Sequence, residues 1–208
     1  MSTARAVLAI ALAAISLAGC AIYPGTARPA DLEDLRAEEG WILLDAVPFV
    51  PQVSKKGCGA ACLAMVLGHW GDGTRVESIE TECVVAGQDG IRASALRDAA
   101  RRRGLSAFLF EGSVADLEHE LSRGRPVVVG VLKPDGAGFT SHFEVVVGLH
   151  PRRMRIAALD PAIGLTSDSL AGFEGEWKPT KGMTLVVFRT ETVADAKKSD
   201  GMQEGDGP

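Results

Sequence analysis

One stretch, residues 51–67, constrains this chain more than any other, because it joins a polar loop directly to an apolar helix through Gly57, Cys58 and Gly59. Within residues 58–70, apolar side chains recur at helical spacing, at Leu63, Val66, Leu67 and Trp70. Cys58 is therefore expected to begin a helix. Unpaired backbone N–H groups and the helix dipole at such an end favour thiolate over thiol. The stretch predicts a reactive cysteine.

The order of the remaining patterns predicts an α+β fold. Helices are expected over 76–84, 94–103 and 114–121, with Thr74 and Glu77 as a capping box for the first and Ser113 as the cap of the last. Strands are expected over 41–47, 106–110, 126–132, 142–149, 154–159 and 183–189, with a glycine-rich loop at 133–140 and a short helix or loop at 168–177. Helices that precede strands predict N-terminal helices packed on a C-terminal antiparallel sheet.

Three further residues supply what a cysteine nucleophile needs. His142 opens a buried strand, and Asp160 ends the next one. Antiparallel pairing across a short turn brings these strand ends to the same side, so the carboxylate can orient the imidazole. Gln52 lies six residues before Cys58, where its amide and the Cys58 N–H could together bind an oxyanion. Glu144 is in phase with His142 and could tune it.

These residues together resemble a known family. Gln52 with Cys58-Gly59, then His142-Phe143, then Asp160-Pro161, stand in the order and context of the bacteriocin-processing, double-glycine leader peptidases. The resemblance covers roughly residues 45–189 and implies a papain-like cysteine peptidase fold. It implies Cys58 as nucleophile, His142 as base and acid, Asp160 as orienter and Gln52 as oxyanion donor, with no cofactor. It also implies a peptide or protein substrate, cleaved after a Gly-Gly-type pair of small residues.

Two rival functions share this pattern. One is an acyl transferase or transpeptidase, in which an amine replaces water on the same Cys58, His142 and Asp160 triad. The other is a peptidase-like module that binds a peptide without cleaving it. The leader peptidases usually precede transporter segments, and no fused transporter domain is expected here, so their usual substrate does not transfer automatically.

The N-terminus predicts export and a membrane anchor. Arg5 precedes an apolar run that ends in Leu17-Ala18-Gly19-Cys20, which resembles a bacterial lipoprotein signal. Residues 1–19 would be the signal peptide, Cys20 the lipidated residue, and 20–40 a tether to a domain over 41–190. Several acyl chains hold a protein firmly on a membrane. Ala21 after the cysteine favours the periplasmic face of the outer membrane.

The charge and the remaining cysteines limit which partners and metal or disulfide sites can be expected. The net charge is −5 and basic residues form no stripe with interleaved aromatics, so no nucleic-acid partner is expected. Outside the cytoplasm, Cys62 and Cys83 are candidates for a disulfide. A zinc site from these cysteines, Cys58 and a histidine is the weaker alternative, because no paired ligand motif follows, and no metal is expected. The polar tail 191–208 is expected to be disordered.

Overall fold

The computed structural model describes residues 25–85 and 90–190 and confirms the α+β class. Its α-helices are α1 (Leu32–Ala37), α2 (Cys58–His69), α3 (Val76–Cys83), α4 (Ala93–Arg102), α5 (Val114–Ser122) and α6 (Leu170–Trp177), joined by the 3-10 turns η1 (Pro151–Arg153) and η2 (Lys178–Thr180). Its strands are β1 (Arg28–Pro29), β2 (Ile42–Leu43), β3 (Ser106–Glu111), β4 (Val127–Asp135), β5 (Gly138–His150), β6 (Arg155–Asp160), β7 (Gly164–Ser169) and β8 (Met183–Phe188).

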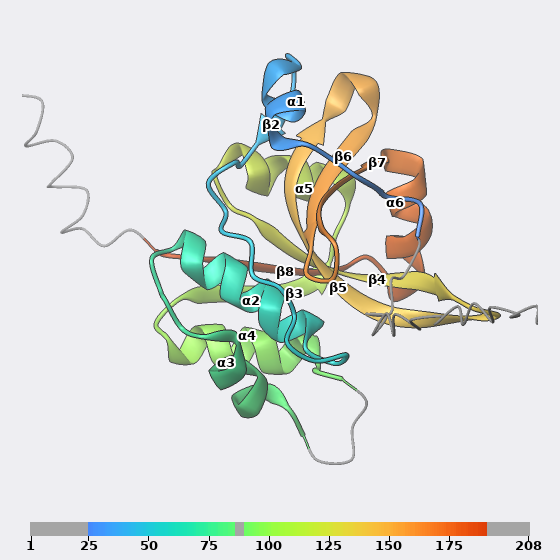
Figure 1. Cartoon of the computed structure of the whole chain (residues 1–208). Coiled ribbons are helices and arrows are strands. Elements are labelled where there is room, and N and C mark those ends of the chain that lie inside the picture. The colour runs from blue at the N-terminus through green and yellow to red at the C-terminus, as the bar shows by residue number, and fades with distance from the viewer. Residues whose placement is uncertain (1–24, 86–89, 191–208) are drawn as a thin grey trace, which may run out of the picture.

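A single antiparallel sheet organises the molecule. Its strand order is β1-β7-β6-β5-β4-β8-β3, and β2 pairs with β5 outside this path. Side chains alternate between two cores: Val128 and Val145 pack with α2, α3 and α4, whereas Val127 and Val146 pack with α5 and α6. Figure 1 shows α2, α3 and α4 grouped to one side and α6 on the other. Because both faces of the central strands are covered, these strands read as continuous apolar runs.

Helix α2 lies in the centre of the larger core. Its residues Cys58–Leu67 are all buried, so the helix is enclosed on every side, whereas the sequence indicated one buried face. Gly59 permits the close approach to the sheet. A Cβ atom there would lie 3.2 Å from a ring carbon of Phe143 in β5 and 3.1 Å from Leu96 in α4. The helix start is thereby packed directly against β5.

Two local expectations were wrong. Thr74 does not cap α3, because its amide and hydroxyl both donate to Asp72. Arg75 is the N-cap residue instead and makes no side-chain capping bond. Residues 133–140 are not a loop either. Strands β4 and β5 run on through them into a hairpin, with Gly136 at φ 57° in the tight turn. Ser113 caps α5 as expected, and with Asp116 it forms a capping box.

The ends of the sheet also differ from expectation. The strand expected over 41–47 is reduced to β2, and β7 precedes α6 where only a short helix or loop was expected. Residues 28–29 form β1 beside β7, and Asp31 caps α1, so the described part of the expected tether is folded onto the domain. The expected signal peptide, Cys20 and the tail 191–208 lie outside the described residues. Among the helices described, none is both long and apolar enough to cross a membrane.

Candidate active site

Cys58 is the first residue of α2 and is 8% exposed. Its N-cap, Gly57, has no side chain to bind the free N–H groups of the first turn, and that turn contains no acidic residue. The amides at this end of the helix therefore remain directed at any negative charge that develops at the Cys58 sulfur or beside it.

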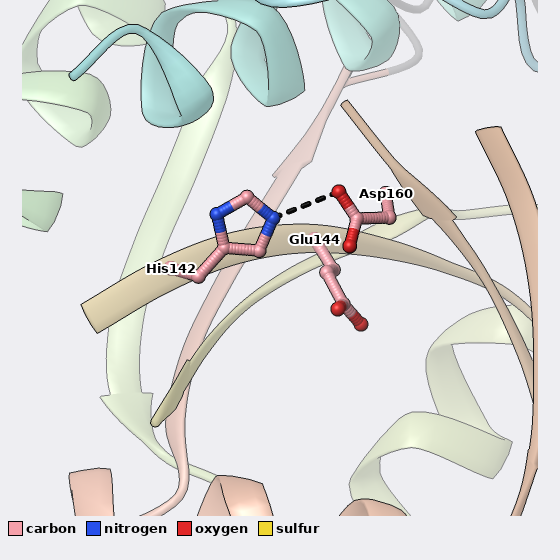
Figure 2. Close-up of side chains that lie close together, drawn as sticks. All are labelled: His142, Glu144 and Asp160. Carbon is pink, nitrogen blue, oxygen red and sulfur yellow. Dashed lines mark hydrogen bonds and ion pairs between the residues drawn. The ribbon is translucent and has the colours of Figure 1, made fainter. Parts of the chain in front are cut away.

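His142 and Asp160 meet across neighbouring strands. Strands β5 and β6 pair antiparallel, with Val145 opposite Leu159, so the two side chains come to the same end of the ladder. His142 Nε2 lies 2.8 Å from Asp160 Oδ1, and both residues are 2% exposed (Figure 2). The Ala162 amide also donates to Asp160 Oδ1, at 2.8 Å. The carboxylate is thus fixed by two donors, one of them the imidazole.

The three groups form a continuous line, because the Cys58 thiol is hydrogen-bonded to His142. Burial alone lowers the pKa of His142, but the hydrogen bonds and negative charges of Asp160 and Cys58 outweigh it and raise that pKa to about 10. For Asp160, burial opposes ionisation, yet the bond and charge of His142 keep its pKa below the ordinary value. The arrangement favours a protonated His142 beside an ionised Asp160 at neutral pH.

The backbone of Gln52 is hydrogen-bonded to the residue that follows Asp160. Its N–H donates to the carbonyl of Pro161 at 3.0 Å, so the loop before α2 is pinned to the residue that follows Asp160. The Gln52 side-chain Oε1 is buried and has no hydrogen-bond partner among the described residues. This unsatisfied atom is an acceptor, so it does not bear on the side-chain NH2 group that would have to donate to an oxyanion.

A groove opens in front of the thiol. It has a volume of about 400 Å³ and is lined by Lys55, Lys56, Cys58, Gly90, Ile91, Phe139, Thr140, Ser141 and Phe143. Cys58 is one of its lining residues, whereas His142 and Asp160 are not. The β4–β5 hairpin forms one side of this groove and carries Phe139, which is 70% exposed. The hairpin that replaced the expected loop therefore shapes access to Cys58.

The other two cysteines stand apart from this line. Cys62 and Cys83 are buried free thiols, so the structure does not form the expected disulfide between them. Burial raises the pKa of Cys62 well above its ordinary value and that of Cys83 to about 11. The Cys83 sulfur instead contacts the carbonyl oxygen of Ala95 at 3.7 Å. Both thiols are held in the unreactive neutral form.

Sequence reasoning missed two buried charges near the site. Lys133 and Glu176 are 2% and 6% exposed, and Lys133 Nζ contacts both Glu144 and Glu176. Lys133 had been assigned to a loop and Glu176 to no role. The sequence holds a clue for Lys133, which is in phase with the buried Val131 of the same apolar strand, and that clue does not extend to Glu176 in helix α6.

Within the described residues, one group of side chains has the spacing of metal ligands, and it includes His142 and Asp160. It consists of His142, Glu144 and Asp160, with one polar atom of each within 4.8 Å of the others. These groups already have ionic partners in Asp160, Lys133 and His142 respectively, and Lys133 supplies the positive charge that a metal ion would bring. Their arrangement fits an ion-pair network better than a metal site.

Comparison with known proteins agrees with this geometry. The sequence profile of the peptidase C39 family matches residues 46–192. The transport/processing ATP-binding protein ComA of Streptococcus pneumoniae is 34% identical over 141 residues, which cover 67% of this chain and 18% of that protein. MesD of Leuconostoc mesenteroides, the mesentericin-Y105 transport/processing ATP-binding protein, is 24% identical and is covered to 20%. The chain thus spans about a fifth of the length of these relatives.

Solved structures show the same fold. The peptidase domain of Streptococcus ComA matches with a TM-score of 0.58 and 23% identity, over 69% of this chain and 99% of that one. A double glycine motif protease from an AMS/PCAT transporter, in complex with its leader peptide, matches with a TM-score of 0.56 and 26% identity, over 69% and 92%. The chain therefore belongs to the peptidase C39 family of cysteine peptidases and has their papain-like fold.

Proposed function

We propose that the protein cleaves an exported peptide or protein through a Cys58–His142–Asp160 triad, with Gln52 and the Cys58 N–H as oxyanion donors. The observation that carries this proposal is the chain of hydrogen bonds from the thiol at the start of α2 through His142 to Asp160, with Cys58 lining a groove. A nucleophile, a base and an orienting carboxylate in contact are the parts that covalent acyl transfer requires.

The proposed reaction has two halves. The Cys58 thiolate attacks the scissile carbonyl carbon, and the oxyanion binds the Gln52 amide and the Cys58 N–H. His142 gives its proton to the departing amine, which leaves a thioester on Cys58. His142, now neutral, takes a proton from water as that water attacks the thioester, and the acid product leaves with the thiolate restored.

The substrate class follows from the relatives rather than from the groove. One structural neighbour is a double glycine motif protease bound to a leader peptide. We propose that this chain likewise cleaves after a Gly-Gly-type pair. Lys55 and Lys56 at the groove would favour acidic residues in the flanking substrate.

A peptide library with a central Gly-Gly pair, incubated with the full chain, tests the activity and separates the rivals by mass. Hydrolysis adds one water, transfer adds the mass of an added amine acceptor, and a binding module leaves all masses unchanged. C58A should abolish cleavage, whereas C62A, which removes a buried thiol one helical turn away, should keep it. Full activity in C58A would refute the mechanism.

We propose further that lipid on Cys20 anchors the domain at the periplasmic face of an outer membrane. The support is the Leu17-Ala18-Gly19-Cys20 sequence. Labelling of cells with a radioactive fatty acid, followed by fractionation, tests this. The wild-type chain should carry label and sediment with membranes, and C20A should do neither. Labelled C20A would refute the assignment.

A further inference from the structure

Three charged side chains form a closed cluster beneath the triad. Lys133 of β4 places its Nζ 2.6 Å from Glu144 Oε1 of β5 and 2.9 Å from Glu176 Oε2 of α6. The contact with Glu144 is an ion pair by distance, although its angles leave Oε1 without a regular hydrogen bond. All three residues are at most 6% exposed. Burial of one cation and two anions costs desolvation free energy, which suggests that the cluster has a role other than stability.

The N-terminal segment seals this cluster. The Thr26 amide donates to Glu176 Oε1 at 2.6 Å, and the Thr26 hydroxyl donates to the same oxygen at 3.1 Å. Gly25 packs so closely that a Cβ atom there would lie 2.5 Å from Glu176 Oε1 and 2.9 Å from Lys133 Cδ. Water is therefore kept from a group of charges that it would otherwise screen.

The cluster borders the triad through Glu144. This residue is two positions from His142 on the same side of β5, and polar atoms of His142, Glu144 and Asp160 lie within 4.8 Å of one another. Figure 2 shows the Glu144 side chain extending away from the His142–Asp160 contact. Two buried carboxylates beside one imidazole repel each other and compete for its proton. A cation that binds one of them removes this competition.

We propose that Lys133 is a positioning residue for the triad: it binds the Glu144 carboxylate and holds it away from His142, so that Asp160 alone orients the imidazole. Its charge also acts directly, because Lys133 lowers the pKa of Asp160 while burial acts in the opposite direction. Burial raises the pKa of Glu144, and Lys133 counters this too. The significance of this inference rests on the proposed function.

A double-mutant cycle with a substrate-free readout tests the proposal. The rate at which iodoacetamide alkylates Cys58 in the full chain is measured from pH 3 to pH 10 by mass spectrometry. The relevant variants are K133M, E144Q and K133M/E144Q. The titratable groups next to His142 are Cys58, Glu144 and Asp160. Lys133 and Glu176 lie beyond Glu144, and Lys55 and Lys56 line the groove.

The proposal predicts three different profiles. K133M leaves two anions beside His142 and should raise the pH of half-maximal alkylation by about one unit, whereas E144Q should lower it. The double variant removes one charge of each sign and should return close to wild type. K178M, which removes an exposed lysine paired with Glu174, is the matched control and should not change the profile.

Several results would overturn the proposal. They are wild-type profiles for both single variants, shifts of both in the same direction, or a double variant that keeps the K133M shift. If circular dichroism shows that K133M does not fold, E144Q decides, and an unchanged E144Q profile overturns the proposal. Alkylation requires no peptide substrate, so a failure to cleave peptides counts against the proposed function and not against the role of Lys133.

Discussion

Replacement of Asp160 by asparagine should change both the rate and the pH range of the reaction. The pKa of His142 stands at about 10 instead of 6.5, a difference that corresponds to about 5 kcal/mol at ~1.4 kcal/mol per pH unit. Asp160 provides the first of the contributions that raise it, against the opposing effect of burial. Asparagine keeps the shape and an acceptor oxygen but loses the charge. Burial should then dominate and lower the pKa of His142 by two or more units.

The expected loss follows from this difference. If the charge of Asp160 supplies about 2–4 kcal/mol of imidazolium stabilisation, D160N should lower kcat/KM by about 30- to 1,000-fold. The alkaline limb of the kcat/KM profile should move from about pH 10 to about pH 8 or below, because His142 loses its proton earlier. Steady-state cleavage of a Gly-Gly peptide by the full chain, measured from pH 5 to pH 11, gives both quantities.

The control is D45N, which removes an exposed carboxylate that pairs with Arg36. It should leave both the rate and the profile unchanged. The reasoning is refuted if D160N keeps kcat/KM within about twofold of wild type, or if its alkaline limb stays in place while the rate falls. The second result would mean that the Asp160 carboxylate contributes geometry but not charge to His142.

Three further outcomes follow from the same geometry. Q52A should lower kcat by about 10²–10³-fold with little change in KM, in steady-state kinetics, because an oxyanion donor acts in the transition state. G59V should lower the free energy of unfolding by about 1–3 kcal/mol in urea titrations, since its side chain would meet Phe143. The stability that His142 gains from its raised pKa should be complete below about pH 6.5 and be lost as pH rises through about 10, and D160N should weaken this dependence.

The sequence predicted the elements whose cause is local. Ser113 was recognised as a helix cap because a serine directly before a helical pattern suits that position, and the structure adds Asp116 as its capping-box partner. Cys58, His142 and Asp160 were selected as candidates because each stands at or near an end expected for an apolar segment, where polar side chains are conspicuous. Thr74 had the same local pattern, but its amide and hydroxyl donate to Asp72 in a turn. The capping rule does not take account of such a competing turn.

Features that depend on distant contacts could not be found in this way. Lys133 looked like a loop residue because its partners, Glu144 and Glu176, come from another strand and from a helix late in the chain. Strand β7 has polar residues and no apolar alternation, and it is held by pairing with β6 and β1. The same applies to the N-terminal segment, whose sealing contact at Thr26 exists only after the sheet has formed.

The measurement that tests the central claim most directly is detection of the acyl-enzyme. The full chain is mixed with a Gly-Gly peptide ester, quenched in acid within milliseconds to seconds, and digested for mass spectrometry. The account predicts that Cys58 carries the acyl group as a thioester, that C62A shows the same adduct, and that the adduct decays as product appears. Rapid product formation with no adduct on Cys58, together with full activity in C58A, would contradict it.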